Sequence, residues 1–120
     1  MEKTDESKKF SSIYGQEEYD FPGEQVEEKD VRGKEMTIYD FAKLNGSFGE
    51  FVVIDAEMTS EIEIAGTPTV RRVKRVQFME GSSIIMEQLI RVKKDGNLPI
   101  VATIIERTSE KSKMTYRTLI

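Results

Sequence analysis

The chain contains no cysteine and no histidine. Without cysteine, disulfides, thiolate metal sites and cysteine catalysis are excluded. Without histidine, the commonest general base and the commonest metal ligand are missing, and so is every catalytic triad that uses histidine. No apolar run approaches the ~18 residues that span a bilayer. The N-terminus, MEKTDESKKF, lacks the apolar segment of a secretion signal. We therefore expect a cytoplasmic location, in the protein's own cell or in a host cell, and no membrane partner.

The charge is distributed unevenly along the 120 residues, a length that predicts one domain. Residues 1–33 carry five cations and ten acids, a net charge of −5. Residues 34–120 carry thirteen cations and twelve acids, a net charge of +1. The acidic surplus therefore lies in the first third of the chain, and the near-neutral remainder neither favours nor excludes a polyanionic partner.

Residues 1–33 contain few aliphatic or β-branched side chains, so we predict a disordered acidic arm. Within it, residues 13–22, IYGQEEYDFP, alternate acidic and aromatic side chains. Such a segment can dock on a basic, apolar groove of another protein, or lie back over a basic groove of this chain. It can also be an ordinary solvated tail.

The stretch from Glu35 to Met58 predicts a long β-hairpin, because two runs rich in β-branched and aromatic residues flank a connection from Gly46 to Gly49. One face of its second strand is wholly apolar and is expected to face the core, whereas the other mixes an aromatic ring with carboxylates and is expected to face water or a ligand. The first set is Val52, Ile54, Ala56 and Met58, and the second is Phe51, Val53, Asp55 and Glu57.

The first strand of this hairpin, residues 36–43, needs a bulge near Tyr39 and Asp40 if Ile38 and Phe41 are both to point inward. Residues 59–68 indicate a loop or a short extra hairpin. A third strand is predicted over residues 69–78, with a second bulge and with Val73, Val76 and Phe78 as its core residues.

A short amphipathic helix is predicted after the third strand, capped by Ser82 or Ser83 and ending at Gly96. Residues 100–107 and 114–120 then form the fourth and fifth strands. Five strands with one helix between the third and the fourth is the order of the oligonucleotide/oligosaccharide-binding (OB) fold, a five-stranded Greek-key barrel.

Residues 33–120 resemble small OB-fold single-stranded-DNA-binding proteins of bacteriophages and mobile elements. The resemblance lies in KEMTIYDF from Lys34, GEFVVI from Gly49, LPIVATI from Leu98 and TYRTL from Thr115. It implies a barrel over residues 34–120 and a role in phage or plasmid DNA replication or recombination.

An OB barrel binds a single strand with cations for the phosphates and exposed rings for the bases, on its second and third strands and on two of its loops. The resemblance places phosphate contacts on its cations and stacking on two rings. The cations are Lys43, Arg71, Arg72, Lys74, Arg75, Lys111 and Lys113, and the rings are Phe48 and Phe51.

Each of these features has a structural alternative. Phe51 could be covered by residues 59–68, and Phe48 could plug the end of the barrel. The cluster from Arg71 to Arg75 could be a solvated strand face paired with neighbouring acids, namely Glu57, Glu61 and Glu63. Tyr39 and Tyr116 are expected in the core or at its rim.

The carboxylates of Asp55 and Glu57 share a strand face and could in principle bind a divalent cation, but no third ligand is implied. We therefore expect no metal and no cofactor. The sequence predicts a non-enzymatic protein that binds single-stranded DNA or RNA. The alternative is an OB-fold protein-interaction module in which residues 13–22 dock on a replication or recombination protein. A further expectation is that residues 17–21 occupy the basic groove and compete with DNA.

Overall fold

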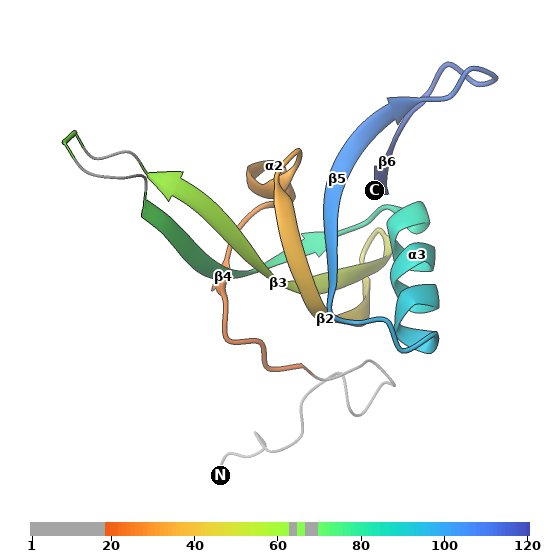
Figure 1. Ribbon diagram of the computed structural model, residues 1–120. Coiled ribbons are helices and arrows are strands. Elements are labelled where there is room, and N and C mark those ends of the chain that lie inside the picture. Colours follow the sequence, from red (N-terminus) through yellow and green to blue (C-terminus); the bar gives the residue numbers. More distant parts are fainter. Residues whose placement is uncertain (1–18, 63–64, 67–69) are drawn as a thin grey trace, which may run out of the picture.

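A computed structural model describes residues 19–62, 65–66 and 70–120. The protein is mainly β, with one sheet of six strands in the order β1-β4-β3-β2-β5-β6 and one long helix, α3, between β4 and β5 (Figure 1). The elements are β1 (Glu24–Gln25), α2 (Glu28–Val31), β2 (Glu35–Gly46), β3 (Gly49–Ile62), β4 (Val70–Glu80), α3 (Ser83–Lys94), β5 (Ile100–Thr108) and β6 (Thr115–Leu119).

The predicted hairpin is confirmed as β2 and β3, which pair antiparallel up to Gly46 and Gly49 around a two-residue turn. The predicted bulge is confirmed as well, because the register between the two strands shifts between Ile38 and Asp40. The extra residue lets Ile38 and Phe41 both reach the core, where they are buried.

The predicted second bulge, in the third strand, is wrong. β4 pairs with β3 in an unbroken register from Glu80 opposite Val52 to Val70 opposite Ile62. Strict alternation therefore buries Val76 and Phe78 and turns Val73 outward, where 60% of its surface is exposed. Val73 does not need to point inward, because it lies opposite Thr59, in the part of the hairpin that extends beyond the core.

Part of the segment predicted to be a disordered arm is ordered. Residues 1–18 lie outside the described residues, but β1 pairs with β4 in parallel, with Glu24 opposite Val76. α2 follows β1, and its Val31 belongs to the hydrophobic core. The sequence gives little sign of this, because a single buried valine in an acidic stretch does not alter its composition.

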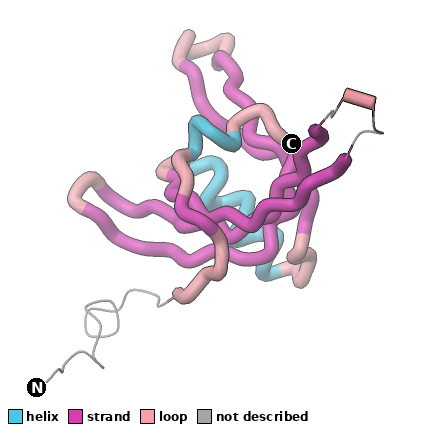
Figure 2. The backbone as a smooth tube through the Cα atoms, turned by 90° about the vertical axis from the view of Figure 1, so that its left-hand side faces the viewer, coloured by secondary structure: helices cyan, strands magenta, loops and turns pink. Residues whose placement is uncertain are grey.

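The core lies inside the curved sheet, whose curvature is visible in Figure 2. The apolar face of β3 packs on the core as predicted, since Val52, Ile54 and Ala56 are fully buried and Met58 is partly buried against them. α3 covers one end of the sheet with Ile85, Met86 and Leu89. Its N-terminus is capped by Ser82, whose hydroxyl accepts the N–H of Ile85 at 3.3 Å, and it exits through Gly96 at φ +73°.

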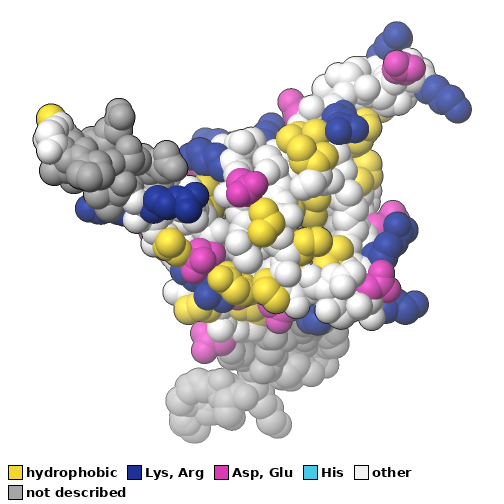
Figure 3. Space-filling view, in the orientation of Figure 1, with side chains coloured by type: hydrophobic (Ala, Val, Ile, Leu, Met, Phe, Trp, Pro, Cys, Tyr) yellow, Lys and Arg dark blue, Asp and Glu magenta, His cyan; other side chains and the backbone are white. Residues whose placement is uncertain are grey.

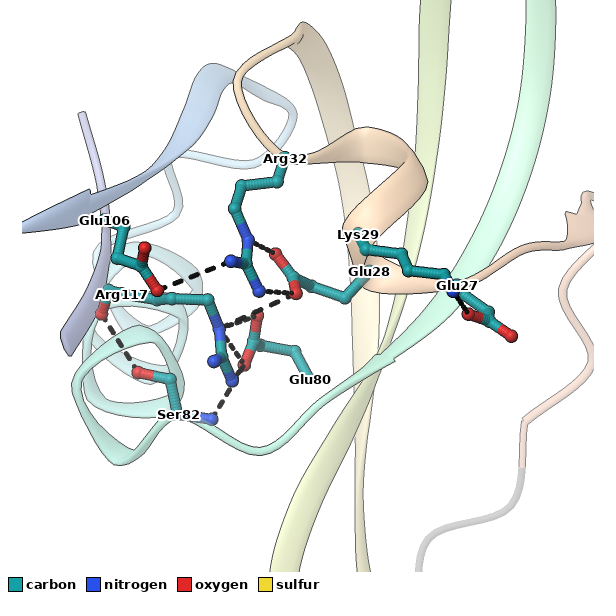
Figure 4. Close-up of polar contacts among 8 residues, drawn as sticks. All are labelled: Glu27, Glu28, Lys29, Arg32, Glu80, Ser82, Glu106 and Arg117. Atoms are coloured by element: carbon teal, nitrogen blue, oxygen red, sulfur yellow. Dashed lines mark hydrogen bonds and ion pairs between the residues drawn. The ribbon is translucent and has the colours of Figure 1, made fainter. Parts of the chain in front are cut away.

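A charge network around the buried Glu80 joins α2, the end of β4, β5 and β6 (Figure 4). Arg117 donates to the fully buried carboxylate of Glu80 at 2.7 Å, and its Nε lies 3.8 Å from the carboxylate of Glu28. Arg32 donates to Glu28 at 2.8 Å and to Glu106 at 3.4 Å. The network links β4 to β6, two strands for which the described residues show no main-chain pairing.

Candidate functional site

The candidate site is the face of β3 and β4 that points away from the core, which we call the outer face. It is formed by Phe51, Val53, Asp55 and Glu57 of β3 and by Val73, Arg75, Gln77 and Met79 of β4. The prediction that this face meets water or a ligand holds only in part. Val53 and Asp55 are each only 4% exposed, so something other than the core covers them.

Asp55 is covered by Arg75. The guanidinium donates two hydrogen bonds of 2.8 Å to the two carboxylate oxygens, and it lies 4.1 Å from the ring centroid of Tyr39. The hydrogen bond to Asp55 raises the pKa of Arg75 above its usual value. The hydroxyl of Tyr39 donates to Glu57 at 3.3 Å and closes the group. The two N–H groups with which Arg75 could bind a phosphate in bidentate fashion are therefore already bound to a carboxylate.

Strand alternation divides the four cations that the sequence places between Arg71 and Arg75. Arg71 and Arg75 lie on the outer face, whereas Arg72 and Lys74 lie on the side of Val76 and Phe78. Lys74 pairs with Glu24 of β1 at 2.8 Å. The four cations therefore do not form one continuous row. In Figure 3, basic and acidic side chains are interspersed on the visible face.

Two phenylalanines lie at the β2–β3 end of the outer face. Phe48 lies in the turn and is fully exposed, at 105%, so the alternative in which it plugs the end of a barrel is wrong. Phe51 is half-buried beside a cavity of about 80 Å³ that is also lined by Leu44 and Val53. Of residues 59–68, which the sequence suggested as a cover for Phe51, Thr59 already lies eight residues further along β3, or ~26 Å at the usual rise per residue. Residues 63–64 and 67–69 lie outside the described residues.

The segment that reaches Phe51 comes instead from the N-terminal part of the chain. Tyr19 and Gln25 line the same cavity as Phe51, and the side-chain amide of Gln77 donates to the carbonyl oxygens of Phe21 and Gly23 at 3.2 and 2.8 Å. Sequence reasoning placed residues 17–21, and so Tyr19, in the groove, but it did not assign Gln77 or Gln25 to the site. The glycine at position 23 is the one sequence feature that fits this contact. A Cβ there would lie 2.6 Å from the backbone of Val76, so only glycine lets the segment lie this close to β4.

The remaining predicted cations are dispersed. Lys43 pairs with Glu50 across the β2–β3 hairpin at 3.0 Å. Lys111 and Lys113 lie in the β5–β6 turn. This turn and the β3–β4 hairpin project from the body in different directions (Figures 1 and 2). A cation that the sequence did not single out, Lys93 of α3, lies 5.3 Å from the ring centroid of Phe41 and pairs with Asp40 at 3.0 Å.

Fold and site together define a small β-sheet protein with an aromatic and polar outer face, partly covered by its own N-terminal segment. Comparisons with protein-family models, with curated proteins and with solved structures found no match. Within the described ranges, no cluster of three or more acidic side chains could hold a metal ion, and no helix has the length and apolarity needed to cross a membrane.

Proposed function

We propose that this chain is a non-enzymatic OB-fold protein that binds single-stranded nucleic acid, DNA or RNA, along the outer face of β3 and β4. The strand order supports the OB fold. If β2 to β6 are taken as the first to fifth strands of an OB barrel, their order in the sheet is third, second, first, fourth, fifth, and α3 lies between the third and the fourth in the chain. OB barrels use the faces of their second and third strands and two loops for oligonucleotides.

Phe48 is the observation that carries the functional proposal. A fully exposed phenylalanine at the tip of a tight turn makes no contribution to the core, and its ring is accessible from both sides. Phe51, two residues into β3, places a second ring at the same end of the face. Accessible aromatic rings are what base stacking requires, and stacking depends little on sequence because every base has a π-face.

The positive charge available for phosphates is smaller than the sequence predicts. Arg75, Lys74 and Lys43 have carboxylate partners within 3.0 Å. Phosphate contacts then depend more on the exposed Arg72 and on the lysines of the β5–β6 turn. A single strand bound mainly by stacking is consistent with this balance.

A titration of labelled oligo-dT with the wild type and with Phe48→Ala tests the proposal. Loss of one stacked base, worth ~1–3 kcal/mol, should weaken binding about 5- to 150-fold. The melting temperature should not change, because Phe48 is fully exposed. Ile90→Ala, at an exposed apolar position on α3, is the matched control and should bind like the wild type. Absence of binding by the wild type at micromolar concentration and low salt would refute the proposal.

The second candidate is a protein-interaction module, and the parallel pairing of β1 with β4 favours it. This pairing shows that the edge of β4 can accept an extended segment as an added strand. Under this alternative, no oligonucleotide would bind at any salt concentration, and Phe48→Ala would instead weaken binding to a protein partner.

A further inference from the structure

We propose that the outer face has two alternative occupants: residues 19–23 of this chain, which lie on it in the structure, and a single nucleic-acid strand, which displaces them. This inference rests on the proposed function and names the competitor of the nucleic acid at that site. It also specifies the chemistry of the competition, which depends on aromatic rings and backbone carbonyls rather than on acidic charge.

The segment covers apolar surface that does not belong to the main core. Ala42 and Val53 are 2% and 4% exposed, yet neither is a member of the core cluster. Tyr19 lines the 80 Å³ cavity beside Val53, and Tyr19 and Phe21 border a hollow of about 390 Å³ with Ala42 and Lys93. The two rings lie 5.2 Å apart between centroids. Tyr19 therefore borders the same cavity as Phe51, where a stacked base would lie, and the ring of Phe21 lies beside Tyr19.

The contacts that hold the segment are few and act on its backbone. Gln77 donates to the carbonyls of Phe21 and Gly23, and the N–H of Val26 donates to the carbonyl of Gln77 at 2.9 Å. β1 adds only two residue pairs to β4. Beyond it, Val31 fixes α2 in the core, so the release of residues 19–23 leaves the rest of the fold in place.

Acidic charge contributes little to this contact. Asp20 is exposed. The salt bridge that follows the segment, from Glu24 of β1 to Lys74 of β4, joins two side chains that are each more than half exposed. Such pairs are worth little and are screened by salt. The competition should therefore persist at a salt concentration that suppresses electrostatic competition.

The test compares the full-length wild type with the double variant Tyr19→Ala/Phe21→Ala in oligo-dT titrations at about 50 and 200 mM salt. If the segment leaves the face open one-tenth of the time, its removal tightens binding about tenfold. We expect the same factor at both salt concentrations. Asp20→Asn is the matched control: it removes charge, keeps both rings, and should bind like the wild type. Tightening by Asp20→Asn, seen only at the lower salt concentration, would overturn the inference.

A second measurement does not depend on the folding of the double variant. The chain has no tryptophan, so Tyr19→Trp introduces a single reporter. Its emission should shift to longer wavelength when oligo-dT is added, because the ring moves from the face into water. If the wild type binds but the double variant binds no more tightly, or if the Tyr19→Trp emission stays fixed, the inference fails and the proposed function stands. If neither the wild type nor the variant binds, the proposed function itself fails.

Discussion

At the residue scale, the contact between Arg75 and Asp55 dominates the outer face. The carboxylate is 4% exposed, and both of its oxygens accept hydrogen bonds from one guanidinium, which also lies over the ring of Tyr39. A buried carboxylate without its donors carries an unfavourable desolvation cost. Arg75 therefore stabilises the sheet, and its place on the outer face is explained without a nucleic acid.

We expect Arg75→Ala to lower the free energy of unfolding by ~1–3 kcal/mol, because it leaves Asp55 buried without its bidentate partner. Arg72→Ala, an exposed arginine on the opposite side of the same strand, is the matched control and should change it by less than ~0.5 kcal/mol. Urea unfolding at neutral pH measures both. Equal effects of the two substitutions would contradict a structural role for Arg75.

At the scale of elements, α2 is a short helix that packs against β4 and is joined to β5 by the salt bridge between Arg32 and Glu106. Its Val31 is 1% exposed and packs in the core, and its Glu28 and Arg32 enter the charge network with Arg117. Four residues are too few for a helix that is stable by itself, so tertiary contacts must hold α2 in place.

Two valines allow a matched test of this packing. Val31→Ala should lower the free energy of unfolding by ~1–3 kcal/mol, because it removes buried methyl groups from the core. Val73→Ala makes the same chemical change at a position that is 60% exposed and should cost less than ~0.5 kcal/mol. Chemical unfolding of both variants measures the difference. If Val31→Ala were as mild as Val73→Ala, residues 24–33 would not be part of the folded unit.

The charge network around α2 gives the stability a defined pH dependence. The hydrogen bond from Arg32, aided by the positive charges of Arg32 and Arg117, holds the pKa of Glu28 below its ordinary value of 4.5 against the opposing effect of burial. Because the folded state favours the carboxylate, this contribution is present above about pH 4.5 and is lost as pH falls through the lowered pKa.

Glu28→Gln should therefore destabilise the protein at neutral pH and reduce the loss of unfolding free energy between neutral pH and about pH 3. Glu87→Gln, at an exposed glutamate on α3, serves as the control and should keep the wild-type pH dependence. The test is to measure the unfolding free energies of the wild type and both variants across this pH range. A wild-type pH profile for Glu28→Gln would show that the network does not depend on its charge.

At the scale of the whole molecule, the surface combines near-neutral charge with extensive pairing. Residues 34–120 carry a net charge of +1, and several cations near the outer face have acidic partners. A nucleic-acid strand that binds there should release few counterions, because few cations of the protein are available to its phosphates. Affinity should therefore come more from the rings than from the charges.

We expect log Kobs for oligo-dT to fall with log salt concentration with a slope of about −2 or shallower, or about three neutralised phosphates at ~0.7 each. If all seven cations that the sequence suggested each contacted one phosphate, the slope would be about −5. A titration series between about 50 and 200 mM salt distinguishes the two. A slope near the steeper value would mean that the ion pairs of Lys43, Lys74 and Arg75 open on binding.

Local patterns were enough for much of the fold. Alternation identified the buried face of β3, the conflict between Ile38 and Phe41 identified the bulge, and the Ser82 cap and Gly96 exit bounded α3. The same reasoning failed for Val73. Its position relative to the core depends on how far the β3–β4 hairpin extends past the other strands, and the pattern within β4 does not contain that information.

The sequence by itself determined the five longer strands, the connection from Gly46 to Gly49, and the helix between β4 and β5, since each depends on residues close together in the chain. Tertiary structure alone decided that Arg75 is held by Asp55, that Gln77 binds the backbone at Phe21 and Gly23, and that Val31 completes the core. These contacts join residues that are 20 or more positions apart. Which acid meets which base, and which segment covers which ring, follows from strand register and chain path, and neither is encoded in a local pattern.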